Sequence, residues 1–277
     1  MSLSIFTNAS SMASTNAMNK SNNLLSTAME RLGTGKRINS AADDAAGLQI
    51  ATRLQGQTNG MTVAQRNISD ATAMLQTAEG AFDEVSNIMY RMKDLATQAA
   101  NDTNSDDDRT AIGAEMTELK SELNNIMNNT KYAGDNLFGT GGKLADKMNF
   151  QIGSSIDEKL TVDVSGHLTK IDVSGGLSID VGDFDESQAT ISGLEAAIAN
   201  VGSMRSALGA NINRLGHTAA NLANMKDNTD LALGNIQDAD YATEASSMSR
   251  NQLLAQTSMS MLKQSNSMSS MVMSLLG

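Results

Sequence analysis

The 277-residue chain has no cysteine, no proline and no tryptophan, and it has only five phenylalanines and three tyrosines. The absence of cysteine excludes disulfides, thiolate metal sites and cysteine nucleophiles. The absence of proline removes the strongest helix breaker and favours long uninterrupted helices. Because large aromatic side chains are so few, we expect a thin core of Leu, Ile, Met and Ala, as between paired helices.

Positive charge is also scarce, since the formal net charge is −11 at pH 7. Nucleic acid phosphates demand a basic surface, so this balance argues against nucleic acid as a partner. The first thirty residues lack a charged segment followed by a continuous apolar stretch, and no run approaches the roughly 18 apolar residues of a membrane span. We expect no membrane segment and no cleavable signal peptide, so the chain either stays in the cytosol or is exported by a separate apparatus.

Apolar residues recur every seven positions from Leu54 to Ala99, with companions three residues later. The two rows read Leu54, Met61, Ile68, Leu75, Phe82, Met89, Ala96 and Gln57, Ala64, Ala71, Ala78, Val85, Met92, Ala99. They are the a and d positions of a coiled coil that runs for more than six heptads. At about 1.5 Å per residue they predict a helical rod of roughly 70 Å.

The same spacing predicts partner helices for this rod at residues 112–126 and 194–236. Arg205 and Lys226 interrupt the companion row of the second one, where they either set its register or extend their charged ends to solvent. The sequence between these helices changes period. Apolar and polar residues alternate at 148–153, 160–164, 168–173 and 177–181, which predicts two antiparallel β-hairpins.

Both ends of the chain carry narrow apolar stripes among Ser, Asn, Thr and Gln, so neither terminal helix is expected to be stable alone. We predict that these stripes make assembly contacts and that repeated lateral packing of copies builds an open helical polymer. The residues expected at these contacts are Met18, Leu25, Leu32, Leu254, Met261, Met268 and Leu275. The predicted fold is mainly α with a small antiparallel β region: a long helical coiled-coil bundle with paired N- and C-terminal helices and β-hairpins at the outer tip.

Two stretches resemble the terminal signatures of the bacterial flagellins. Residues 30–47 read ERLGTGKRINSAADDAAG, and residues 238–244 read DADYATE, followed by Ser249-Arg250. The similarity continues through residues 77–81 and the closing Leu275-Leu276, and it extends over residues 1–153 and 190–277. It departs from the family in the last helix, where a proline is common and this chain reads NSMSS at 266–270.

The resemblance implies a structural subunit that self-assembles into the extracellular flagellar filament for swimming motility, exported by the flagellar type III system. It implies a terminal coiled-coil domain of residues 1–44 with 237–277, which lines the filament core. A helical rod domain with a β-hairpin would comprise residues 45–153 with 190–236, and residues 154–189 would form a variable surface-exposed β region.

The resemblance also implies partners: a secretion chaperone at the C-terminal helix, the filament cap, the hook-filament junction proteins, and a Toll-like receptor in a host. The positions that match the receptor-facing residues of similar flagellins are Arg91, Leu95 and Glu115. Junction proteins have similar ends, so a hook-filament junction protein or a minor filament-associated binding protein is the alternative interpretation.

Residues that could carry out chemistry are few. His167 and His217 are the only imidazoles and lack metal-ligand spacing, so we expect surface or packing roles. The carboxylates between residues 180 and 186 could bind calcium, but without a matching loop glycine we interpret them as a solvated acidic loop. Residues 139–142 are not followed by the Lys-Ser/Thr of a phosphate loop and predict a turn. We expect no enzyme activity, no cofactor and no metal.

Overall fold

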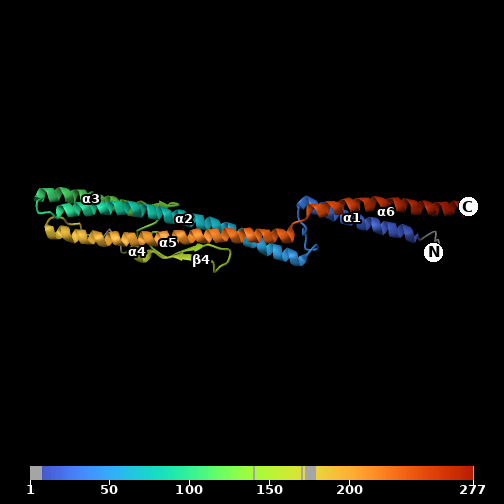
Figure 1. The fold of residues 1–277 in the computed structure, drawn as a ribbon, viewed down its shortest axis with the longest axis horizontal. Helices are drawn as coiled ribbons and strands as arrows, with labels where there is room; N and C mark the ends of the chain where they lie inside the picture. The colour runs from blue at the N-terminus through green and yellow to red at the C-terminus, as the bar shows by residue number, and fades with distance from the viewer. Residues whose placement is uncertain (1–7, 140, 170, 172–178, 277) are drawn as a thin grey trace. The chain divides into compact units, whose positions relative to one another are not determined.

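The computed structural model describes residues 8–139, 141–169, 171 and 179–276, and for residues 269, 270 and 272–276 it describes the backbone alone. Six helices and four short strands follow one another along this part of the chain (Figure 1). The helices are α1 (Ala9–Thr34), α2 (Ala45–Ala99), α3 (Asp106–Asn129), α4 (Ser165–Leu168), α5 (Phe184–Gln237) and α6 (Tyr241–Leu276). The strands are β1 (Lys131–Tyr132), β2 (Asp135–Asn136), β3 (Met148–Gln151) and β4 (Lys159–Val162). The expected class, mainly α with a small antiparallel β region, is confirmed.

The chain divides into two compact units. The first comprises Met1–Gly56 with Asn228–Gly277, and the second is Gln57–Asp227. The division falls inside α2 and α5, whereas the sequence placed a boundary near residues 44 and 237. Residues 154–189 lie within the second unit and do not form a unit of their own.

The second unit has one continuous apolar core drawn from α2, α3, α5 and the β region. Both heptad rows of α2 are buried from Met61 to Ala99, as their spacing predicts. Upstream, Leu54 is half-buried and Gln57 is exposed, so the coiled-coil seam does not extend to the predicted start of the rows. Alternation of large and small side chains, such as Phe82 and Ala78, lets the partner helices approach α2 closely.

Ion pairs fix the register of α5 against α2. Arg205 donates to Glu79 through Nη2 at 2.9 Å and pairs with Asp83 Oδ1 at 2.9 Å. Lys93 Nζ lies 2.9 Å from Glu195 Oε1. The order of these pairs makes the two helices antiparallel. The hydrogen bond that Arg205 donates to Glu79 is the main cause of the raised pKa of Arg205. Arg205 therefore interrupts the apolar row in order to bind two carboxylates of the facing helix.

The β-hairpins lie along the side of α2 and not at the outer tip, which is a correction to the expected arrangement. β3 pairs with β4 in the register Met148↔Val162 to Gln151↔Lys159. Asn67 Nδ2 of α2 donates to the Gln151 carbonyl at 3.2 Å. The end of this unit is formed by the turn between α2 and α3, beside the start of α5 (Figure 1). A two-stranded hairpin needs apolar cover for one face, and the side of a long helix provides it.

The second expected hairpin is not formed as predicted. Leu168 is the last residue of the short helix α4 and does not begin a strand. Residues 170 and 172–178 lie outside the described residues, and residues 179–181 are not in a strand. A smaller hairpin, β1 with β2, forms instead directly after α3. Its turn contains Ala133 and Gly134, both at positive φ. Alternation of apolar and polar residues did not predict this hairpin, because strands of two residues are too short to show a period.

Helix α3 begins at a reciprocal cap. The Asp108 N–H donates to the Ser105 hydroxyl at 3.2 Å, and the Ser105 N–H donates to Asp108 Oδ2 at 3.0 Å. Three aspartates, Asp106 to Asp108, occupy the first turn, where negative charge interacts favourably with the helix dipole. The Ser105 hydroxyl, and then its N–H, lower the pKa of Asp108 by donating to the carboxylate.

We predict that replacing Arg205 by Gln reduces the free energy of unfolding of the second unit by about 1 kcal/mol, because two carboxylates of α2 lose a partly shielded partner. Urea unfolding followed by circular dichroism measures this loss, and high salt should shrink it. Arg214→Gln, at an exposed position on the same helix, is the control. Equal losses for the two variants would contradict a specific role for Arg205.

The cap of α3 should make stability depend on pH. A carboxylate whose pKa is lowered by folding adds stability above its unfolded value of about 3.9 and loses it as pH falls through the folded value. We therefore expect Asp108→Asn to destabilise the chain at pH 7 and to make no difference at a pH below the folded pKa. Asp107→Asn removes the same charge from the same turn and should reduce the free energy of unfolding by less. Urea midpoints at a series of pH values test this, and a pH-independent effect would argue against the cap.

Candidate functional site: the terminal helix pair

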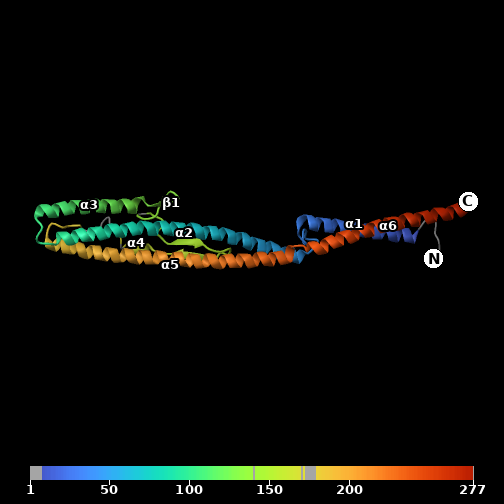
Figure 2. The same cartoon turned by 45° about the horizontal axis from the view of Figure 1, so that its top comes forward.

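The first unit contains an antiparallel pair of helices, α1 and α6, which lie side by side in both views (Figures 1 and 2). At one end, Arg31 Nη1 lies 3.4 Å from Glu244 Oε1. At the other, Asn8 Nδ2 donates to the Ser265 hydroxyl at 2.9 Å, and the Ser11 hydroxyl donates to Asn266 Oδ1 at 3.0 Å. Segments more than 200 residues apart in the sequence are thus joined along their length.

The contact rows of this pair contain few large apolar side chains. On each helix, half-buried or buried residues recur at alternating steps of three and four, the spacing of a coiled-coil seam. The α1 row is Ser11, Ser14, Met18, Ser21, Leu25, Ala28 and Leu32. The α6 row is Glu244, Met248, Asn251, Ala255, Ser258, Leu262 and Ser265. Only Ser21 and Ala28 of α1 are fully buried. The seam therefore removes little apolar surface from water.

Apart from Met248 and Leu262, the larger apolar residues of α6 whose side chains are described lie outside this seam. Five of them are between 47% and 64% exposed. At about 100° per residue they fall within an arc of roughly 100° that begins beside the seam and continues away from it. We name this arc the apolar face of α6, defined as Leu253, Leu254, Met261, Met268 and Met271. Met259 is also exposed but lies on the other side of the seam. Three exposed residues of α1, Met12, Leu24 and Met29, add to the apolar surface of the pair.

The structure divides the predicted contact residues into two groups. Met18, Leu25 and Leu32 are half-buried in the seam between α1 and α6. Leu254, Met261 and Met268 belong to the exposed apolar face and are available to another chain. The side chain of Leu275 lies outside the described part of α6. Heptad spacing alone did not distinguish the row that faces the partner helix from the row that stays exposed in one chain.

A polar clasp, residues 34–44 with 236–240, joins the segments that connect these helices to α2 and α5. Lys36 and Asp238 form an isolated antiparallel β-bridge. The Arg37 N–H donates to the Gln237 carbonyl at 2.7 Å, and the Ala239 N–H donates to the Gly35 carbonyl at 2.9 Å. The clasp unites the two most distinctive stretches of the sequence, which hydrogen-bond to each other.

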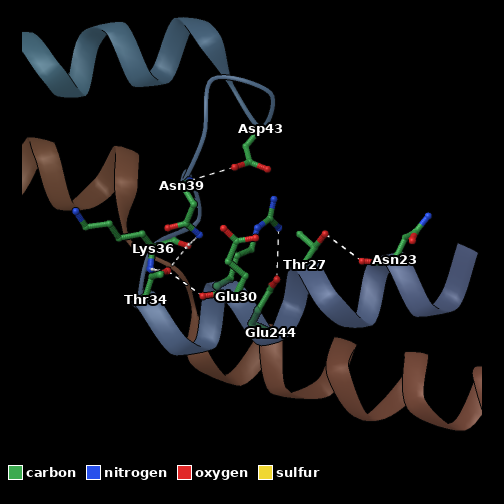
Figure 3. Close-up of polar contacts among 9 residues, drawn as sticks. Asn23, Thr27, Glu30, Thr34, Lys36, Asn39, Asp43 and Glu244 are labelled. Atoms are coloured by element: carbon green, nitrogen blue, oxygen red, sulfur yellow. Dashed lines mark hydrogen bonds and ion pairs between the residues drawn. The ribbon is translucent and has the colours of Figure 1, made fainter.

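Side chains stabilise the clasp locally (Figure 3). Asp43 accepts hydrogen bonds from the backbone N–H groups of Ser40 and Asn39, and these bonds lower its pKa, the one from Ser40 most. The Thr243 hydroxyl, and then the N–H of Ala242, lower the pKa of Asp240 in the same way at the start of α6. These carboxylates act as caps that hold the loop and the helix start in one conformation.

Two glycines of the clasp region are required by geometry. Gly35 ends α1 with φ of 72°, the left-handed region, and its N–H donates to the Arg31 carbonyl. A Cβ on Gly47 would lie 2.7 Å from Cδ1 of the buried Ile38. The missing side chain at Gly47 therefore lets α2 start directly over Ile38 and bury it.

The predicted receptor-facing residues do not share one surface. Arg91 Nη2 donates to Glu115 Oε1 at 2.7 Å, and both side chains are about half exposed. Leu95 is only 3% exposed and belongs to the core. At about 100° per residue, Leu95 is turned roughly 40° from Arg91 around α2, toward the side that packs in the core. In the folded chain, the ion pair of Arg91 and Glu115 lies on the surface and Leu95 does not.

The other candidate groups do not converge on a chemical site. His167 is half-buried in α4 and His217 is exposed on α5. Asp183 accepts from the Glu186 N–H at 2.7 Å and so caps α5. Desolvation, and then Asp180 and Asp183, raise the pKa of Glu186. Across the residues that the structure describes, no group of three metal-binding side chains converges, and no helix there has an apolar stretch long enough to cross a membrane.

Comparison with known proteins identifies the family. The bacterial flagellin N-terminal helical region matches residues 5–141, and the bacterial flagellin C-terminal helical region matches residues 191–276. A flagellin of Halalkalibacterium halodurans is 38% identical over 253 residues, 90% of each chain. Polar flagellin C of Vibrio parahaemolyticus is 32% identical with all of both chains covered.

A solved structure supports the fold independently. The putative flagellar hook-associated protein from Vibrio parahaemolyticus aligns with a TM-score of 0.57 over 71% of this chain and 100% of its own, at 19% sequence identity. This similarity concerns the fold alone. The family matches at both ends, which include both halves of the clasp, establish that the chain belongs to the bacterial flagellin family and is a structural subunit of a flagellar filament.

Proposed function

We propose that copies of this subunit polymerise through the apolar face of α6. The observation that supports this is the contrast within the terminal pair: the seam between α1 and α6 contains mostly small and polar side chains, while Leu and Met side chains of α6 stay exposed. A single chain therefore leaves the five side chains of this face about half exposed to water. A second copy placed over them would supply the missing burial.

The magnitude of this burial suits assembly. Fully burying one Leu or Met side chain contributes roughly 1.5–3 kcal/mol. Covering most of a five-residue face adds several such contributions for every neighbour that a subunit gains. Ordering two helices with many Ser and Asn residues opposes this gain, so an isolated pair is marginal and a packed pair is stable. Contacts between a face and a different surface of the next copy repeat without closing and produce an open helical polymer.

The same surface suggests how the subunit meets other proteins. An exposed apolar face in an unassembled chain promotes aggregation, and a secretion chaperone that covers α6 before export would prevent it. We infer export by the flagellar type III system without a cleavable signal peptide, an extracellular location in the filament, and a role in swimming motility. Filament cap and hook-filament junction proteins would meet the subunit at the two ends of the polymer.

A host Toll-like receptor is a further proposed partner. Arg91 and Glu115 are accessible to it as an ion pair, and Leu95 would contribute only if α2 or α3 moved. Catalysis has no place in this proposal, because the contacts that we invoke are made by apolar side chains.

We predict that Leu254→Lys with Met261→Lys slows elongation of filament seeds by roughly 100-fold or more, because two charges would be buried in an apolar contact. Purified monomer is added to short filament fragments, and growth is followed by light scattering and electron microscopy. The matched control is Gln252→Lys with Gln256→Lys, which adds the same charge at exposed positions of α6 outside the face. Circular dichroism checks that both variants keep their helix content.

Two results would overturn the proposal. If the control slows growth as much as the test variant, charge alone and not the apolar face controls elongation. If unaltered monomer does not extend seeds at any salt concentration, but forms a complex of fixed stoichiometry with a hook or cap protein, the chain is a junction or minor binding protein.

A further inference from the structure

Methionine is the side chain of this protein that is most open to oxidation. The chain has 19 methionines and neither cysteine nor tryptophan. Thioether sulfur takes up one oxygen atom from a peroxide to give the sulfoxide, a polar and chiral group. Susceptibility depends on access to the sulfur, so burial decides which methionines react.

The methionines differ widely in burial, and those at the two extremes differ most in their access to an oxidant. Met89, Met92, Met116 and Met204 have no exposed surface and are enclosed in the core of the second unit. Met261, Met268 and Met271 of the apolar face are 59%, 54% and 62% exposed. An oxidant in solution therefore reaches the face before it reaches the core.

The three exposed sulfurs are grouped on one stripe of α6. Met261 and Met268 are one heptad apart, and Met271 follows one turn later, so adjacent members share a helix side. Their apolar neighbours on the face, Leu253 and Leu254, have no sulfur and cannot be oxidised in this way. Oxidation would therefore change one continuous part of the face and leave the rest apolar.

We propose that Met261, Met268 and Met271 are a site of reversible oxidation that prevents the free subunit from polymerising. In each step the O–O bond of a hydroperoxide breaks, one oxygen bonds to the methionine Sδ, and the other leaves as water or alcohol. The sulfur is oxidised by two electrons and the peroxide is reduced. A thiol-dependent methionine sulfoxide reductase reverses the step, since two thiols become a disulfide and the oxygen leaves as water.

The effect on assembly follows from the surroundings of the sulfur. In water, the sulfoxide oxygen is hydrated and the subunit stays folded. In an apolar contact between copies it would lose those hydrogen bonds, which disfavours association. In the polymer the same sulfurs would be covered and protected. The inference rests on the proposed polymerisation through this face, and it adds that the chemical state of three methionines controls it.

The test compares oxidised and untreated monomer in seeded elongation. Monomer is treated with hydrogen peroxide, the peroxide is removed, and peptide mass spectrometry locates each sulfoxide. We expect sulfoxide at Met261, Met268 and Met271 and none at Met89 or Met92. Elongation should slow by at least about tenfold. Treatment with both epimer-specific sulfoxide reductases and dithiothreitol should restore it. The same peroxide dose given to finished filaments should leave the three sulfurs largely unreacted.

Leucine variants separate this site from other oxidation. Met261→Leu, Met268→Leu and Met271→Leu together keep the face apolar and similar in volume, so the triple variant should elongate normally and should resist peroxide. Met259→Leu alters an exposed methionine on the other side of the seam and should stay sensitive. A triple variant that peroxide inhibits as strongly as the unaltered chain would overturn the proposal.

The two proposals fail in distinguishable ways. If polymerisation does not use the apolar face, the double lysine variant elongates normally whatever the oxidation state. If the face is used but oxidation does not control it, the lysine variant is inhibited while fully sulfoxidised monomer elongates at the untreated rate. Sulfoxide that forms equally in monomer and filament would also contradict the site, because the contact would then leave the sulfurs in water.

Discussion

The small side chains in the seam between α1 and α6 set the main constraint on this protein. With Ser, Ala and Asn in most contact positions, the two helices can pair but cannot bury enough apolar surface to be independent of their surroundings. Hydrogen bonds such as Asn8 to Ser265 give the pair a register without adding much stability, because water competes for the same groups. Five larger apolar residues of α6, those of the apolar face, lie outside the seam and do not reinforce the pair. The terminal pair therefore gains little stability from its own seam.

The second unit is built in the opposite way. Large side chains such as Phe82, Met89 and Leu208 are fully buried between its helices, and Arg205 binds two carboxylates of the facing helix. This unit closes its own core and leaves the hairpins on the side of α2. Its apolar core closes within one chain, whereas the seam of the terminal pair is mostly half-buried. The same heptad spacing thus produces two different structures, and side-chain size at the contact rows determines which one forms.

Much of the fold follows from sequence spacing, and the errors have physical causes. The α2 rows were predictable because the apolar pattern repeats without interruption from Met61 to Ala99, and every residue of these rows is buried. The position of the hairpins was not predictable, because alternation indicates a strand but does not say which helix covers it. Leu168 falls in a helix of four residues, too short for any period to reveal. At the candidate site, spacing identified Met261 and Met268 as apolar, but exposure depends on which α6 row faces α1, and two rows of α6 have the heptad spacing.

The clasp gives a structural role to the two stretches that resemble the flagellin signatures, although neither carries reactive groups. The hydrogen bonds within the terminal pair add little stability to its register, and the backbone bonds of the clasp reinforce that register where the pair joins α2 and α5. There, Gly35 ends α1 with positive φ, Asp43 holds the following loop, and the bridge between Lys36 and Asp238 aligns the two segments. A side chain at Gly47 would push against Ile38 and disturb the start of α2. At these positions the backbone geometry or a cap depends on the side chain, or on its absence. The apolar face needs only side chains of the right polarity and size, so Leu and Met can replace one another on it. The terminal helices can therefore remain weak within one chain, because the clasp sets their alignment and contacts between chains would supply their stability.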